Sequence, residues 1–153
     1  MASPALIQEW KNAQMEQEQI PEVPSSALLL ESQGDAFRRE LAHAERLLGS
    51  RDEHDEPYYS RETLDRGAEF LRMHAEWIWK SCGSKAPVPT IGPGPQGSLD
   101  LYWKMSSFEL LVNIPASDGE LGTFFARDNN KQTAKGSFDP KRFALSIASW
   151  LMM

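Results

Sequence analysis

Three glycines, Gly92, Gly94 and Gly97, fit the pattern G-x-G-x-x-G of dinucleotide-binding loops. Such a loop holds a pyrophosphate because it leads from a strand into a helix whose free N–H groups and dipole face the anion. Here the preceding KAPVPTI contains two prolines, the following SLDLYWK alternates like a strand, and Pro93 and Pro95 lack amide hydrogens. The pattern therefore predicts a stiff linker of polyproline character and not a phosphate site.

A second candidate site is the charged stretch DEHDEPYY at residues 52–59. A hard cation could be held by the cluster Asp52, Glu53, His54, Asp55 and Glu56, and an enzyme built on this loop would use His54, Asp55, Glu56 and Tyr58. The zinc deaminase signature H-x-E also needs P-C-x-x-C, which a chain with one cysteine cannot supply, and the stretch lacks the spacing of a calcium loop. Because charged runs normally face water, we expect a solvated loop, with a small metal-dependent hydrolase as the alternative.

No catalytic nucleophile can be assigned from the sequence. Cys82 follows the end of a predicted helix, where no helix N-terminus can activate its thiolate, and no serine lies in a G-x-S-x-G frame. His43 and His74 are expected to be ordinary surface or boundary histidines. The sequence therefore predicts a non-enzymatic protein with no catalytic residue, metal site or cofactor.

The composition is that of a globular protein, since 41% of the 153 residues are hydrophobic and 25% are charged. A single cysteine fits a reducing compartment. The first residues do not resemble a signal peptide, and the longest apolar runs, ALLL and WLMM, fall far short of the ~20 residues of a membrane span. We expect a soluble, acidic, cytoplasmic protein.

The net charge of −6 is unevenly distributed. Residues 1–97 hold ten basic and sixteen acidic side chains, and residues 98–153 hold six of each. Nucleic-acid binding would use the basic residues near the end of the chain, Arg127, Lys131, Lys135, Lys141 and Arg142. Because six acidic residues offset them, nucleic-acid binding is disfavoured.

Two amphipathic helices are predicted in the first half. The earlier one, at about residues 36–48, has Asp35 as its cap. The later one, at about 61–81, begins after Ser60 and carries the apolar stripe Leu64, Ala68, Leu71, Ala75 and Ile78. A short loop between one-sided helices indicates an antiparallel hairpin.

After Gly97 the hydrophobic period changes from 3.6 to 2. Four strands with tight turns are predicted over about 98–138, as a sequential antiparallel meander. Asp139-Pro140 then predicts the start of a terminal helix at about 140–152. The expected fold is α+β, with the helices packed on one face of a four-stranded antiparallel sheet.

The partner in this interpretation is another protein or a second copy of the chain. Residues 1–34 are expected to form an arm, with a short helix at about 4–18 carrying Leu6, Trp10 and Ala13 on one face, before a single domain at 35–153. An arm that orders on a partner can wrap a large surface. The candidate partner-binding residues are Trp10, Leu28, Leu29, Trp79 and Tyr102.

Tyr102 belongs to a second apolar face that the strand pattern predicts, together with Leu111 and either Phe124 or Phe125. A sheet that is apolar on both faces needs a second cover, which would be the N-terminal segment or another chain.

Residues 87–115, PVPTIGPGPQGSLDLYWKMSSFELLVNIP, resemble a recurrent pattern in small uncharacterised bacterial proteins. In that pattern a proline-rich segment leads from a helix into a G-S-x-D-L-x-W strand, whose hairpin partner ends in N-I-P. The resemblance carries no established activity and no functional residues. It implies a binding role, either antitoxin-like or as an accessory protein of a defence system.

Overall fold

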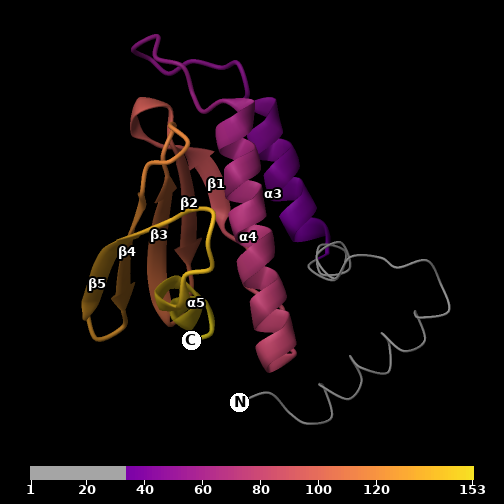
Figure 1. Cartoon of the computed structure of the whole chain (residues 1–153), viewed down its shortest axis with the longest axis vertical. Coiled ribbons are helices and arrows are strands. Elements are labelled where there is room, and N and C mark those ends of the chain that lie inside the picture. Colours follow the sequence, from indigo (N-terminus) through magenta and orange to yellow (C-terminus); the bar gives the residue numbers. More distant parts are fainter. Residues whose placement is uncertain (1–33) are drawn as a thin grey trace, which may run out of the picture.

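The computed structural model describes residues 34–153 as an α+β fold with an antiparallel sheet (Figure 1). The helices are α3 (Asp35–Arg46), α4 (Arg61–Cys82) and α5 (Leu145–Leu151). The strands are β1 (Thr90–Pro93), β2 (Leu99–Lys104), β3 (Phe108–Ile114), β4 (Gly122–Asp128) and β5 (Thr133–Phe138). Figure 1 shows α3 and α4 running side by side next to the sheet, with α5 close to its strands. The predicted fold class is confirmed.

The sheet is a meander with the order β1-β2-β3-β4-β5, so the predicted number of four strands is wrong by one. The missing strand is β1, which the proline-rich sequence predicted to be a linker. Ile91 pairs with Leu101, and Pro93 pairs with Leu99. Proline is tolerated here because β1 is an edge strand, where an absent N–H need not break the ladder. The linker is therefore half of a hairpin.

Helix α4 confirms the strongest helix prediction, within one residue at its end. The Ser60 side chain accepts a hydrogen bond from the Thr63 amide at 3.2 Å, and Gly83 ends the helix at φ 66°. The buried face is broader than the predicted stripe, since it also contains Gly67, Phe70 and His74. Gly67 lets α4 approach the sheet closely, because a Cβ there would collide with the Leu99 side chain.

Helix α3 begins and ends slightly earlier than predicted. Gly34, at φ 76°, occupies the N-cap position without a side-chain hydrogen bond, so the prediction that Asp35 is the cap is wrong. The helix packs beside α4 and against β1. There the Ile91 amide, on the sheet edge, donates to the Glu40 carboxylate at 3.2 Å. This bond ties α3 to the edge of the sheet.

The terminal helix is shorter than predicted, because it begins at Leu145 and not at about residue 140. The Asp139 carboxylate accepts a hydrogen bond from the Lys141 amide at 2.9 Å, so it closes a separate turn and does not cap the helix. Ala144 is extended at φ −117° and becomes the N-cap. The Asp-Pro pair thus begins a turn that precedes the helix.

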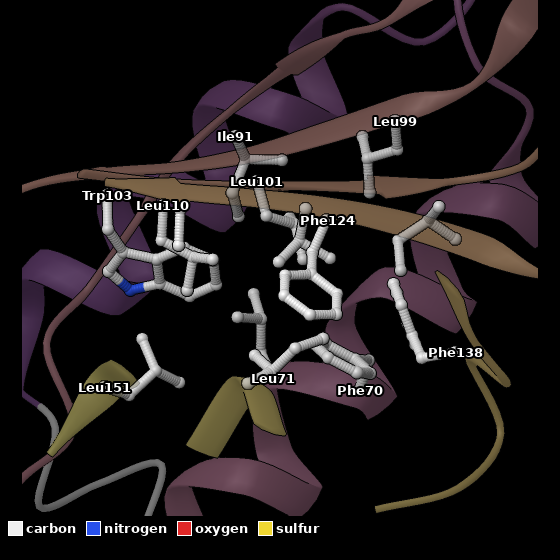
Figure 2. Packing of buried hydrophobic residues seen from close by; sticks show 14 of the residues in the cluster. Phe70, Leu71, Ile91, Leu99, Leu101, Trp103, Leu110, Phe124, Phe138 and Leu151 are labelled. Atoms are coloured by element: carbon white, nitrogen blue, oxygen red, sulfur yellow. The ribbon is translucent and has the colours of Figure 1, made fainter. Parts of the chain in front are cut away.

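The core lies between the sheet and the helices α4 and α5. Figure 2 shows Trp103, Leu110 and Phe124 projecting from the strands toward Phe70, Leu71 and Leu151. Every second residue of β2 and β3 is buried on this face, which we call the inner face. The residues that alternate with these buried ones point to the opposite side of the sheet.

His74 is buried in this core, with 1% of its surface exposed, so the prediction of a surface or boundary histidine is wrong. Its Nδ1 lies 2.8 Å from the Phe70 carbonyl oxygen, and its Nε2 accepts a hydrogen bond from the Ala144 amide at 3.0 Å. Since an amide can only donate, Nε2 carries no proton and Nδ1–H donates to Phe70. His74 therefore joins α4 to the start of α5, and burial lowers its pKa.

Candidate functional site: the outer face of the sheet

The outer face, which we define as the face opposite α4 and α5, carries its exposed side chains in rows across the strands. The central row consists of Tyr102, Leu111 and Phe125, which are register partners on β2, β3 and β4. These side chains are 36%, 38% and 47% exposed, respectively. We call them the apolar row. Among residues 34–153 they form a contiguous run of large exposed hydrophobic residues on neighbouring strands.

A shallow hollow of about 500 Å³ lies beside the apolar row, over β3, β4 and β5. The residues that line it are Leu111, Asn113, Thr123, Phe124, Phe125, Lys135, Gly136 and Ser137. Apolar surface dominates the hollow, and Lys135 adds a positive charge at one end. Apolar walls with a few polar groups are typical of a recognition surface.

A polar row runs parallel to the apolar row and is held by hydrogen bonds. Asn113 Nδ2 donates to Asp100 Oδ1 and to Ser98 Oγ, each at 2.8 Å. Ser98 Oγ donates to the Pro95 carbonyl oxygen at 2.6 Å. Partial burial raises the pKa of Asp100, and the Asn113 bond opposes that shift. These hydrogen bonds stabilise the β1–β2 hairpin.

The glycine pattern lies in this hairpin. Gly94 packs on the network, since a Cβ there would lie 2.8 Å from both Asn113 Nδ2 and Asp100 Oδ1. Gln96 and Gly97 turn the chain with φ values of 57° and 77°, and β2 follows at once. The segment after the glycines is thus a strand, as predicted, and offers no helix N-terminus to an anion.

A charged row borders the apolar row on the other side. Glu109 lies between Lys104 and Arg127 in the register and accepts a hydrogen bond from Arg127 at 3.0 Å. Within residues 34–153, Lys104 of this charged row forms no ion pair, and neither does Lys135, which pairs with Phe125 at the β5 end of the apolar row.

Of the five predicted partner-binding residues, the structure describes Tyr102 and Trp79, and it does not bring these two together. Tyr102 lies on the outer face, but Trp79 is half-buried on α4, on the other side of the sheet. Trp10, Leu28 and Leu29 lie outside the described residues. The structure instead joins Tyr102 to Leu111, which the strand alternation placed on its face, and to Phe125, where the sequence left Phe124 and Phe125 as alternatives. The sequence could not reveal the hollow, because it depends on the register between strands.

The 52–59 loop is an ordered turn that uses its polar groups internally. The Asp52 carboxylate accepts hydrogen bonds from the Glu56 and His54 amides, at 2.9 and 2.8 Å, and the Glu56 bond is the main cause of its lowered pKa. Arg51 donates to the Asp55 carbonyl oxygen at 2.7 Å. In the part of the chain that the structure describes, no three histidine, cysteine or acidic side chains are placed to hold a metal ion.

Three of the five candidate nucleic-acid cations form ion pairs. Arg127 pairs with Glu109, Lys141 with Asp118 at 2.6 Å, and Arg142 with Asp139 at 3.6 Å. The hydrogen bond from Lys141 is also the main cause of the lowered pKa of Asp118. Most of this basic charge is therefore locally compensated.

Comparisons with known proteins supply no relative for the chain. No protein-family model matches it, and neither a search of curated proteins nor a search of solved structures finds a similar one. Of the helices in residues 34–153, none combines the length and the apolar character that a membrane span requires.

Proposed function

We propose that the chain is a non-enzymatic protein-binding module and that its outer sheet face is the binding surface. The observation that carries the proposal is the apolar row in the middle of a sheet whose inner face is already filled. A contiguous apolar patch rimmed by polar residues marks an interaction site on many soluble proteins. The hollow beside the row offers room for a partner's side chain.

The network around Asp100 supports a binding role over a catalytic one. Its polar side chains bond to one another and to the hairpin backbone, so they serve to hold a rigid frame for the apolar row. Rigid surfaces lose little conformational entropy on association. The partner is another protein or a second copy, and an antitoxin-like or defence accessory role is the narrower form of this proposal.

The test compares Leu111→Glu with Leu121→Glu in the full chain. Leu111 lies in the apolar row, whereas Leu121 is 61% exposed in the loop before β4, so both changes place a carboxylate on a solvent-facing leucine. Sedimentation first determines whether the chain self-associates. Proteins that copurify with the tagged chain are then identified, purified and titrated individually. Only Leu111→Glu should weaken binding or self-association, by about tenfold or more, which corresponds to at least ~1.4 kcal/mol.

If both variants bind equally well, the outer face is not the binding surface. Unchanged circular dichroism spectra and urea midpoints ensure that the comparison concerns folded proteins.

A further inference from the structure

We propose that the helix expected at residues 4–18 lies across the outer face in the same molecule, with Leu6, Trp10 and Ala13 over the apolar row. The outer face would then be covered when no partner is bound. Three properties of residues 1–33 favour this occupant: the spacing of their apolar side chains, their net charge and the length of chain that they provide. The first residues of the chain offer the matching side chains, and the sheet offers the uncovered row.

The spacing of the two sets of side chains agrees. Leu6 and Ala13 are seven residues apart, which in a helix with a rise of ~1.5 Å per residue is about 10 Å. Tyr102 and Phe125 are two strands apart, which at ~4.8 Å per strand is also about 10 Å. A fifteen-residue helix spans about 22 Å, close to the ~19 Å across five strands. Trp10 would then lie near Leu111, at the centre of the row.

The charges of the two surfaces are complementary. Residues 1–33 contain five acidic side chains and one basic side chain, Lys11. The outer face presents Lys104 beside the apolar row and Lys135 at its β5 end, where Lys135 pairs with Phe125, and within residues 34–153 neither forms an ion pair. Acidic side chains flanking the apolar face of the helix can therefore approach one cation beside the row and another at its β5 end.

The chain is long enough for this placement. Gly34, where the described residues begin, precedes α3, which is bonded to the edge strand β1 through Glu40 and Ile91. The apolar row begins on β2, the neighbouring strand. Residue 18 lies sixteen residues before Gly34, and an extended chain of that length reaches about 50 Å. That reach exceeds the distance around one sheet edge and across five strands.

Residues 4–18 would also regulate partner binding, a role that rests on the proposed function. A partner that binds the apolar row must first displace residues 4–18. Its apparent affinity is therefore its intrinsic affinity multiplied by the fraction of molecules whose outer face is uncovered. The coverage itself does not depend on any partner.

The experiment is hydroxyl-radical footprinting of the purified full chain, with oxidation of Tyr102 and Phe125 followed by mass spectrometry. The disrupting variant is Trp10→Glu, and the matched control is Gln8→Glu, which adds the same charge on the opposite side of the expected helix. Trp10→Glu should increase oxidation of both side chains several-fold, and Gln8→Glu should leave it unchanged. Leu145, on α5 and 60% exposed, is the internal reference.

A second variant, Lys135→Glu, keeps residues 1–33 intact and should also increase the oxidation of Phe125, because it replaces attraction by repulsion. Oxidation that is equal in wild type and Trp10→Glu overturns the inference. Protection that disappears on dilution also overturns it, because the cover is then a second copy. Since no partner is present, failure here leaves the proposed function to be decided by Leu111→Glu.

Discussion

The two faces of one sheet differ in what their side chains contact. On β3, Leu110 points to the inner face and is 0% exposed, whereas its neighbour Leu111 points to the outer face and is 38% exposed. Both residues are leucine, and both belong to the same paired strand. Burial here is thus decided by what lies above each face: α4 and α5 cover the inner one.

The difference separates side chains that hold the fold from those available for binding. The inner face is filled by packed hydrophobic residues, in which each truncation leaves a cavity. The outer face combines an apolar row, a hydrogen-bonded polar row and a charged row. Truncation of its exposed residues should affect recognition more than stability. Matched pairs of variants on the two faces test this contrast.

The largest difference is expected between Leu110→Ala and Leu111→Ala. Leu110→Ala should lower the free energy of unfolding by about 2–5 kcal/mol, because it removes buried contacts and leaves a cavity. Leu111→Ala should cost less than ~1 kcal/mol, since its side chain is already partly in water. Urea unfolding of both variants measures the difference. Equal losses would mean that the outer face is as tightly packed as the inner one.

The next effect concerns two glycines on opposite faces. A Cβ at Gly122 would point to the inner face and lie 2.7 Å from the Asn113 carbonyl oxygen, while a Cβ at Gly92 would meet no atom within 4 Å. Gly122→Ala should destabilise the fold by about 1–3 kcal/mol through overpacking. Gly92→Ala should be neutral or stabilising by less than ~1 kcal/mol. Thermal unfolding compares them, and a neutral Gly122→Ala would contradict the close packing of β4.

The smallest effect is a pH dependence arising from His74. Burial lowers its pKa in the folded state, so the unfolded chain binds a proton first as the pH falls below about 6.5. Stability should therefore decrease from about pH 7.5 to about pH 5.5, because protonated Nε2 cannot accept from Ala144. His74→Gln should flatten this slope, whereas His43→Gln, at an exposed position of α3, should retain it. Urea midpoints at the two pH values measure the slope. An unchanged slope in His74→Gln would exclude this histidine as the cause of the pH dependence of stability.

Local chemistry made α4 and the four strands from β2 to β5 predictable. Ser60 and Gly83 mark the helix ends through hydrogen bonding and backbone conformation, and both act within a few residues. The alternation of apolar and polar residues in β2 and β3 indicates that one face of the sheet is covered. These signals need no information about distant parts of the chain.

Contacts between distant residues caused the errors. Strand β1 has a proline-rich sequence, and it pairs because β2 lies beside it and Glu40 of α3 bonds to Ile91. The start of α5 is shifted because Ala144 donates to His74, seventy residues earlier. In both cases a contact with a distant residue outweighs the local preference of the sequence, because short helices and strands are only marginally stable by themselves.

The candidate site was half predictable for the same reason. Alternation assigned Tyr102 and Leu111 to one face, but only the register showed that they are neighbours and that Phe125 continues the row.

By itself, the sequence determined the fold class, the hydrophobic alternation and the ends of the long helix, because these depend on side-chain period and short-range hydrogen bonds. The tertiary structure decided which face of the sheet α4 and α5 cover, which strands pair at the edge, and which side chains meet in the apolar row. Those choices depend on cross-strand register and burial, which are properties of residues far apart in the chain and near one another in space.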